Sequence, residues 1–305
     1  MRRLLERRGI RLTKSLGQNF LHDAHHLERI TAAAELTRTD RVLEIGPGLG
    51  PLTGHLLAQA DEVLAIETDV RLVKVLEERF NVTRDTQLPS ILHGGGQPPH
   101  RRQGSAAEPA GNRTPGLATG LRLLHADALQ LLKQERHDWS DWKVVSNLPY
   151  SVASPILVEL ARGPRSPQRV VATLQLEVAH RLMSDPGHKD YGILTLLVQL
   201  DFEPVRWFKI PSGCFFPQPD VDSACIVLKR RSTVLLPETL RPVYVKVVKR
   251  AFSQRRKMML KLLKQDWNPE KLGAACEQLG LSPQIRAEAV SLEQFVELSR
   301  RLAAA

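Results

Sequence analysis

Short apolar runs alternate with segments of helical periodicity along most of the chain. The apolar run at 42–45 ends in a glycine-rich turn, a helix-like segment follows at 51–60, and a second apolar run occupies 62–66. This order predicts a strand, a tight turn, a helix and a second, parallel strand. Further strands are expected at 121–125, 143–146, 170–174, 202–210 and 224–229, and further helices at 24–34, 70–80, 128–133 and 192–200. The pattern favours an α/β fold, with 202–210 and 224–229 forming an antiparallel pair.

Periodicity is lost over residues 84–120, which contain 7 of the 19 glycines and 5 of the 20 prolines. A segment of this composition buries too little apolar surface to offset the entropy lost on ordering. We therefore predict a flexible insertion in a crossover loop at about 84–120.

The turn after the first strand indicates a nucleoside site. Gly46, Gly48 and Gly50 alternate in V-L-E-I-G-P-G-L-G, and Glu67 ends the next strand 21 residues after Gly46, where an acid can bind ribose hydroxyls. The dinucleotide pattern G-x-G-x-x-G is absent because Pro51 replaces its third glycine, and no P-loop sequence occurs. Alternate glycines suit S-adenosylmethionine (SAM), although a purely structural loop could have the same letters.

Two other polar positions point toward this site. Asp127 follows the strand at 121–125 and could accept a hydrogen bond from an adenine amino group, or simply cap the next helix. Gln18 and Asn19 precede an apolar pair and predict either a turn that closes over a ligand or a helix cap.

The tetrapeptide Asn147-Leu148-Pro149-Tyr150 follows the strand at 143–146 and suggests the chemistry. An adenine amino nitrogen is a poor nucleophile because its lone pair is delocalised into the ring. The Asn147 side-chain oxygen and the Leu148 carbonyl could accept both amino hydrogens and so direct the lone pair at an electrophile. The Tyr150 ring could stack on an extruded base, which is worth about 1–3 kcal/mol.

The charge of the chain indicates the kind of partner that it binds. The net charge of +10 and the pI near 9.8 indicate a polyanionic partner, nucleic acid before membrane. Residues 241–264 hold nine Lys or Arg and no acid, which favours contact with RNA phosphates, for which we single out Arg255, Arg256 and Lys257. Residues 1–14 form a second basic stretch, interpreted as an N-terminal arm.

Three cysteines without a C-x-x-C pair, and ten histidines without a recognised ligand spacing, predict neither a disulfide framework nor a metal site. Together with the lack of an apolar run long enough to span a membrane, this composition favours a reducing cytoplasm.

The chain resembles the ribosomal RNA small-subunit adenine dimethyltransferase family (KsgA/RsmA type). The matching pieces cover nearly the whole sequence in order: residues 14–21, 44–50, 65–67, 127–129, 147–150, 175–179, 191–192, 215–223 and 255–258. The resemblance implies a Rossmann-like class I SAM-dependent methyltransferase, with a seven-stranded, mostly parallel sheet and a small all-helical C-terminal domain. It implies dimethylation of two adjacent adenosines in a hairpin near the 3′ end of small-subunit rRNA, within the immature subunit.

By the same resemblance, the SAM-contacting positions are Asn19, Leu21, Gly46, Glu67, Asp127 and Asn147, beside Gly48 of the glycine turn. Asn147 and Tyr150 match the target-base pocket, and Phe215 is expected as a second stacking ring. Two departures are the long insertion and Leu176, which replaces a lysine common in the family.

We expect a methyltransferase domain at 1–232 and a helical RNA-binding domain at 237–305, in a monomer. Two other functions stay open: a large-subunit rRNA methyltransferase of the macrolide-resistance type, and a ribosome-assembly or transcription factor that has lost transfer. The intact glycine turn and base pocket argue against the latter.

Overall fold

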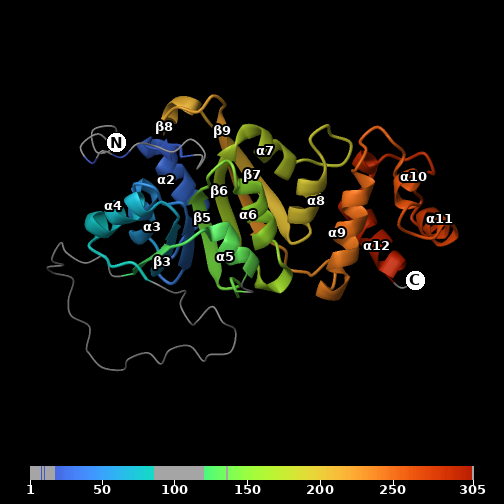
Figure 1. Cartoon of the computed structure of the whole chain (residues 1–305), viewed down its shortest axis with the longest axis horizontal. Helices are drawn as coiled ribbons and strands as arrows, with labels where there is room; N and C mark the ends of the chain where they lie inside the picture. The colour runs from blue at the N-terminus through green and yellow to red at the C-terminus, as the bar shows by residue number, and fades with distance from the viewer. Residues whose placement is uncertain (1–7, 9, 11–17, 86–119, 135–136, 304–305) are drawn as a thin grey trace, which may run out of the picture.

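The computed structural model describes residues 8, 10, 18–85, 120–134 and 137–303. A central sheet is covered by helices on both faces, and a group of helices follows at the C-terminal end (Figure 1). The sheet has seven strands: β2 (Arg41–Ile45), β3 (Glu62–Glu67), β4 (Leu121–His125), β5 (Trp142–Asn147), β6 (Arg169–Gln175), β7 (Phe202–Ile210) and β9 (Ser223–Arg230).

The strand order is β4-β3-β2-β5-β6-β9-β7. The first five strands are parallel, and β9 is antiparallel to both of its neighbours. The predicted α/β class and the antiparallel pairing of 202–210 with 224–229 are therefore confirmed. Of these two strands β7 is at the edge, whereas β9 lies inside the sheet.

Seven helices accompany the strands of the sheet: α2 (Ala24–Ala33), α3 (Pro51–Leu57), α4 (Val70–Phe80), α5 (Ala128–Gln134), α6 (Ala153–Leu160), α7 (Leu176–Leu182) and α8 (Ile193–Gln199). The C-terminal helices are α9 (Arg241–Ala251), α10 (Met259–Leu263), α11 (Pro269–Gln278) and α12 (Leu292–Ala303). Short 3₁₀ turns occur at η3 (Gly163–Arg165), η4 (Ser212–Cys214), η5 (Glu238–Leu240) and η6 (Ala287–Ala289).

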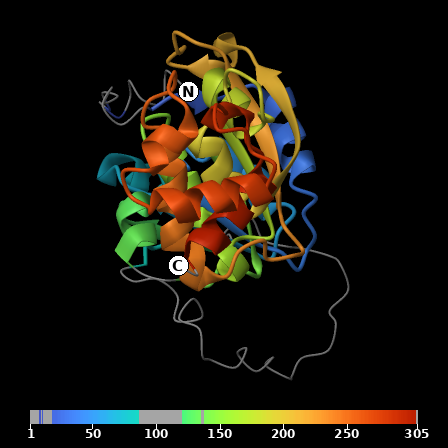
Figure 2. The same cartoon turned by 90° about the vertical axis from the view of Figure 1, so that its right-hand side faces the viewer.

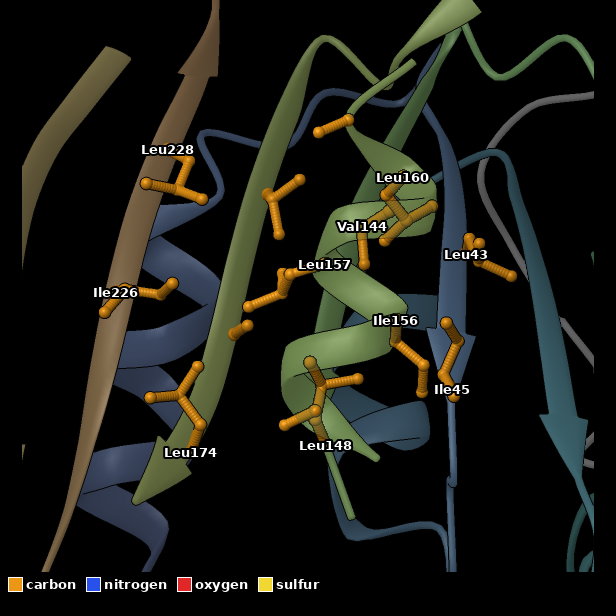
Figure 3. Packing of buried hydrophobic residues seen from close by; sticks show 14 of the residues in the cluster. Leu43, Ile45, Val144, Leu148, Ile156, Leu157, Leu160, Leu174, Ile226 and Leu228 are labelled. Carbon is orange, nitrogen blue, oxygen red and sulfur yellow. The ribbon is translucent and has the colours of Figure 1, made fainter. Parts of the chain in front are cut away.

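Alternation along the strands produces two separate cores, because successive side chains point to opposite faces of a sheet. Leu43 of β2 belongs to the cluster under α5, α6 and α7, whereas Val42 belongs to the cluster under α2, α3 and α4. Figure 3 shows α6 against the first face, where Ile156 and Leu157 pack near Val144 of β5.

Two α-helices and two strands that accompany the sheet were not predicted from the sequence. Helices α6 and α7 are short, with eight and seven residues, and neither begins with a side-chain cap that would mark it in the sequence. Strands β1 (Phe20–Leu21) and β8 (Phe215–Phe216) have two residues each and form their own antiparallel sheet. Pairing between segments so distant in the chain has no local pattern to reveal it.

The C-terminal helices lie together (Figure 2), and their buried side chains form a third apolar cluster. It includes Tyr244 and Phe295 from α9 and α12, and also Tyr191, Leu196 and Leu200 from the segment around α8. Packing therefore continues across the expected boundary between 232 and 237, and α8 contributes to the cores on both sides of it.

The expected basic arm at 1–14 and the expected insertion at about 84–120 fall almost entirely outside the described residues. Among the described helices, none is both long and apolar enough to cross a lipid bilayer.

Strands β2 and β5 separate toward their carboxyl ends. Their pairing runs from Arg41 opposite Trp142 to Leu43 opposite Val144 and then stops. Beyond this point the buried Ser146 hydroxyl replaces the hydrogen bonds between the two strands. It accepts a hydrogen bond from Ile45 N (2.9 Å) and donates one to Ile45 O (2.5 Å). One side chain thus satisfies both backbone groups where the ladder ends, and the strands can part without leaving buried polar groups unpaired.

Replacing Ser146 by Ala should destabilise the fold by about 1–3 kcal/mol, since it leaves two buried backbone groups without partners. Urea unfolding followed by circular dichroism measures this loss. Exposed Ser232→Ala is the control, and equal stability of the two variants would contradict the bridging role.

Glu44 of β2 is 1% exposed, and burial raises the pKa of its carboxyl group to about 8, with the nearby Glu67 carboxylate acting in the same direction. A carboxyl group whose pKa is higher in the folded than in the unfolded state stabilises the fold at low pH. That contribution is lost as the pH rises from about 4.5 to about 8.

Glu44→Gln should remove this dependence, so the variant should gain stability relative to wild type between pH 6 and pH 9. Unfolding free energies measured by urea titration across this range test it. Parallel pH curves for the two proteins would show that Glu44 does not titrate in this way.

Candidate active site

A cleft with a total empty volume of about 870 Å³ opens at the carboxyl ends of β2, β3, β4 and β5. The chain runs outward from β2 to β3 and β4 on one side, and β5 and β6 lie on the other, so β2 and β5 flank the point at which the strand order reverses. Open parallel sheets bind ligands at this point.

The glycine turn forms the floor of the cleft. Gly46 has φ of +70° and Gly48 has φ of +62°, a region that side-chain-bearing residues rarely adopt. A Cβ on Gly48 would lie 2.5 Å from the Phe20 ring, and one on Gly46 would lie 3.3 Å from Pro149. Glycine here therefore lets Phe20 and the turn after β5 approach the backbone closely.

Glu67 lies beside this turn at 4% exposure. One carboxylate oxygen accepts hydrogen bonds from the backbone N–H groups of Thr68 and Asp69 (2.9 Å each), and the other accepts one from Gly48 N (3.1 Å). Burial raises the pKa of Glu67, and these three backbone donors oppose that rise. The acid and the glycine turn thus form one hydrogen-bonded unit.

Asp127 lines the cleft from the end of β4, and its Oδ1 atom accepts a hydrogen bond from Gln130 N (3.0 Å) at the start of α5. The two interpretations of this residue are therefore compatible, since capping uses one carboxylate oxygen. Gln18 and Asn19 also line the cleft. The cap of α2 is Asp23, so the turn at 18–19 covers the site instead of capping that helix.

Asn147 joins two sides of the cleft. Its Nδ2 atom donates a hydrogen bond to Asn19 O (2.8 Å), which fixes the amide plane. Its Oδ1 atom is buried and accepts no hydrogen bond within the described part of the chain. A buried acceptor without a donor costs free energy, so this oxygen is suited to receive a donor from a ligand.

Leu148 is held by its own N–H, which donates to Thr173 O (3.0 Å) on β6. Its side chain is 1% exposed and belongs to the core, so any contribution to a ligand comes from the backbone. Tyr150 is partly buried beside the cleft, and its hydroxyl shares a short hydrogen bond with Ser223 Oγ. Burial raises the pKa of this hydroxyl.

Two predicted site residues lie in the core. Leu21 and Phe215 are each 2% exposed, pair with each other across β1 and β8, and pack in the cluster under α2 and α3. Strand alternation turns the Phe215 ring into this core, so the stacking role expected of it stays a prediction that the structure does not favour. Phe216 points the other way and packs in the cluster that contains Phe20.

The predicted RNA contacts lie in the turn between α9 and α10, far from the cleft in sequence, and all three are exposed. Arg255 donates to Lys189 O and lies 3.6 Å from a Glu288 carboxylate oxygen. Arg256 and Lys257 have no ion pair with any described residue.

Residues 241–264 contain no acid, but in the fold acids from other segments lie close to several of their cations. Asp201 pairs with Arg241, and Asp266 pairs with both Arg250 and Lys246, the latter at 3.3 Å. Acids outside 241–264 therefore neutralise several of its cations. Exposed cations of this segment that no described acid pairs remain available for phosphates: Lys249, Arg256, Lys257, Lys261 and Lys264.

Several residues that line the cleft were not predicted from the sequence. Thr68, Ser151, Val152 and Ile156 line it without having been proposed. The first two adjoin predicted residues, so spacing could have found them. Ile156 belongs to α6, which was not predicted, and only the packing of this helix on the sheet brings it to the site.

These observations fit a nucleoside-bearing cofactor. A glycine cradle lies next to a buried acid, Asp127 stands at the neighbouring strand end, and Asn147 presents a buried acceptor that no described residue donates to. The walls between these polar groups are apolar, formed in part by Ile45, Ile66 and Leu129. Apolar walls with a few convergent polar groups are typical of cofactor sites.

Comparison with known sequences gives one consistent result. The family described as "Ribosomal RNA adenine dimethylase" matches residues 9–93 and 111–304. Ribosomal RNA small subunit methyltransferase A of Geobacter metallireducens is 36% identical over 97% of this chain and 97% of its own length. The protein of the same name from Latilactobacillus sakei is 33% identical, over 98% and 92%.

Solved structures agree on the fold. A dimethyladenosine transferase from Plasmodium falciparum superposes with a TM-score of 0.69 at 21% identity, over 92% of this chain and 95% of that one. The 23S rRNA methyltransferase ErmE superposes with a TM-score of 0.62 at 27% identity, over 93% and 100%. With a family match over most of its length and relatives more than 30% identical from end to end, this chain belongs to the ribosomal RNA adenine dimethylase family.

Proposed function

We propose that this protein uses SAM to dimethylate the exocyclic amino groups of two adjacent adenosines in a hairpin near the 3′ end of small-subunit rRNA. The family match supports the reaction. The observation that carries it to this chain is the buried Oδ1 of Asn147, which accepts no hydrogen bond from the residues that the structure describes.

The cofactor would lie along the carboxyl ends of β2, β3 and β4. Gly46, Gly48 and Asn19 would hold its amino acid part, Glu67 its ribose hydroxyls and Asp127 its adenine amino group. Leu21 could contribute only through its backbone, since its side chain is buried. When bound, the cofactor supplies an electrophilic methyl group.

Catalysis by this chain would consist of orienting the attacking amine. Asn147 Oδ1 and the Leu148 carbonyl would accept hydrogen bonds from its two N–H groups and so leave its lone pair free to attack the methyl group that the cofactor supplies. The bond from Nδ2 to Asn19 O holds Asn147 in place before the substrate arrives. Preorganised polar groups of this kind need no reorganisation during the reaction.

The target base would stack on Tyr150, whose ring is held by its bond to Ser223. For a second ring we now favour Phe216 over Phe215, because Phe216 is the more accessible and lies next to Phe20 at the cleft. The transfer repeats on one nitrogen, so the pocket must also admit the monomethyl amine.

The substrate is assigned to the small subunit because the relatives that match at 33% and 36% are small-subunit enzymes, whereas ErmE, a 23S rRNA enzyme, matches at 27%. We further propose that the protein acts as a cytoplasmic monomer on the immature subunit, bound through the exposed cations around α10. The fold relation to ErmE makes the large-subunit rRNA the alternative substrate.

Asn147→Ala should lower methyl transfer by about 100- to 1,000-fold, as expected for the loss of one preorganised polar group, while SAM binding stays measurable. Transfer of labelled methyl groups to undermethylated small subunits and, in parallel, to large subunits, followed by mapping of the modified bases, measures both rate and site. SAM binding is measured by calorimetry.

Gln134→Ala, on the exposed end of α5, is the control and should transfer at the wild-type rate. Near-normal transfer by Asn147→Ala would remove the role of this amide. Label found only in the large subunit would assign the alternative substrate.

Neutralising Arg256 and Lys257 together with glutamine should weaken rRNA binding and reduce the slope of log K against log salt by about two, one for each cation that no longer binds a phosphate. Arg255→Gln should have a smaller effect, because Glu288 already neutralises part of its charge. Filter binding over a salt series measures these slopes. Lys271→Gln on α11 is the control for the loss of a single charge, and an identical slope for all four proteins would exclude phosphate binding at this turn.

A further inference from the structure

Three side chains with metal-binding atoms meet outside the cleft. Asp23 Oδ1 lies 2.8 Å from His26 Nδ1, and Cys214 Sγ lies 3.7 Å from the same nitrogen. The three donor atoms all fall within 4.8 Å of one another. Among the described residues, this is the one group of three or more His, Cys, Asp or Glu side chains that could hold a metal ion.

The fold, not the local sequence, brings these residues together. Asp23 and His26 lie at the start of α2, directly after β1, whereas Cys214 ends η4, directly before β8. Antiparallel pairing of β1 with β8 continues in a bond from His22 N to Cys214 O (3.0 Å), which brings the thiol over the first turn of α2. Figure 1 shows β8 beside the N-terminal part of this helix.

Helix capping accounts for only part of this arrangement. Asp23 Oδ1 accepts a hydrogen bond from His26 N (2.9 Å), as an N-cap does. Capping requires neither the imidazole nor the thiol. Both nevertheless face the same carboxylate, although Cys214 and His26 are 188 residues apart in the chain.

Thiolate, imidazole and carboxylate together suit Zn²⁺ and similar borderline ions. Metal–ligand lengths of about 2.0–2.3 Å at tetrahedral angles place sulfur and nitrogen about 3.6 Å apart, and nitrogen and oxygen about 3.4 Å apart. The sulfur–nitrogen separation is already close to this value. The oxygen–nitrogen separation would open by about 0.6 Å as the ion replaces the hydrogen bond between them.

We propose that Asp23, His26 and Cys214 form a binding site for one divalent ion of the zinc type, with water completing the tetrahedron. The His26 side chain is 13% exposed and that of Asp23 is 39% exposed, so an ion can enter from solvent. On binding, the thiol proton is released to solvent and the imidazole binds through Nδ1 with its proton on Nε2.

Such an ion would hold β1 and β8 together at one end. β1 carries Phe20, whose ring lies against Gly48 on the floor of the cleft, and β8 carries Phe215 and Phe216. Metal occupancy would therefore stiffen the cover of the cleft. The proposed metal site is inferred from its three side chains alone and does not rest on the proposed function.

The metal-free full-length protein, kept reduced, is titrated with Co²⁺ as a spectroscopic substitute for Zn²⁺. We expect one ion per chain, visible d–d bands of a four-coordinate ion, and a thiolate-to-cobalt charge-transfer band in the near ultraviolet that Zn²⁺ abolishes. Cys214→Ser should remove the charge-transfer band. His26→Ala should weaken binding by at least about 100-fold, because removal of a residue that only supports a ligand already costs about 10- to 100-fold.

His25→Ala is the matched control: its imidazole is exposed, adjacent in the chain and outside the trio, so binding should stay within twofold of wild type. A second measurement needs no variant, since Zn²⁺ should protect Cys214 of the wild-type protein from alkylation, as read by peptide mass spectrometry. Absence of a charge-transfer band in wild type, its survival in Cys214→Ser, or unchanged alkylation with Zn²⁺ would each overturn the site. None of these readouts depends on methyl transfer.

Discussion

The cleft depends on how the sheet ends between β2 and β5. Their ladder stops after three residue pairs, and Ser146 then binds both backbone groups of Ile45 through its hydroxyl. Without such a bridge, two strands that part inside a protein would leave unpaired polar groups in an apolar core. The bridge permits the glycine turn on one strand and the Asn147 turn on the other to face each other across an open space.

On this frame, Glu67, Asn147 and Leu148 of the cleft are each held by hydrogen bonds to backbone atoms. Glu67 is fixed by three backbone donors, Asn147 by the Asn19 carbonyl, and Leu148 by Thr173. Backbone partners do not rotate as side chains do. The orientation of the Asn147 acceptor is therefore set before any substrate arrives, which is what catalysis by positioning requires.

The two-residue strands β1 and β8 connect the site to the rest of the molecule. They bring Phe20 onto the glycine turn and Phe215 into the core, and their ends bring Cys214 to the start of α2. A short strand pair forms few hydrogen bonds. A metal ion bound at its end would therefore have a large effect on how well the pair is ordered. The same pair explains why Phe216, and not Phe215, is turned away from the core.

In the C-terminal region, charge shows how tertiary structure changes a sequence argument. Residues 241–264 contain no acid, yet Asp201, Asp266 and Glu288 reach several of their cations from other elements. Phosphate binding is left to the exposed cations that these acids do not reach. A linear count of charge overestimates the basic surface because folding pairs charges that are distant in the chain.

The sequence alone determined the α/β class, the seven main strands, the glycine turn with Glu67, and the place of Asn147 at the carboxyl end of a strand, within one residue. These features follow from local periodicity and fixed spacing, which every segment carries within itself. Tertiary structure decided the β1–β8 pair, the inward turn of Phe215, the contribution of Ile156 and the meeting of Asp23 with Cys214. Each of these depends on contacts between segments far apart in the chain, where the identity of one residue carries no information about its partner.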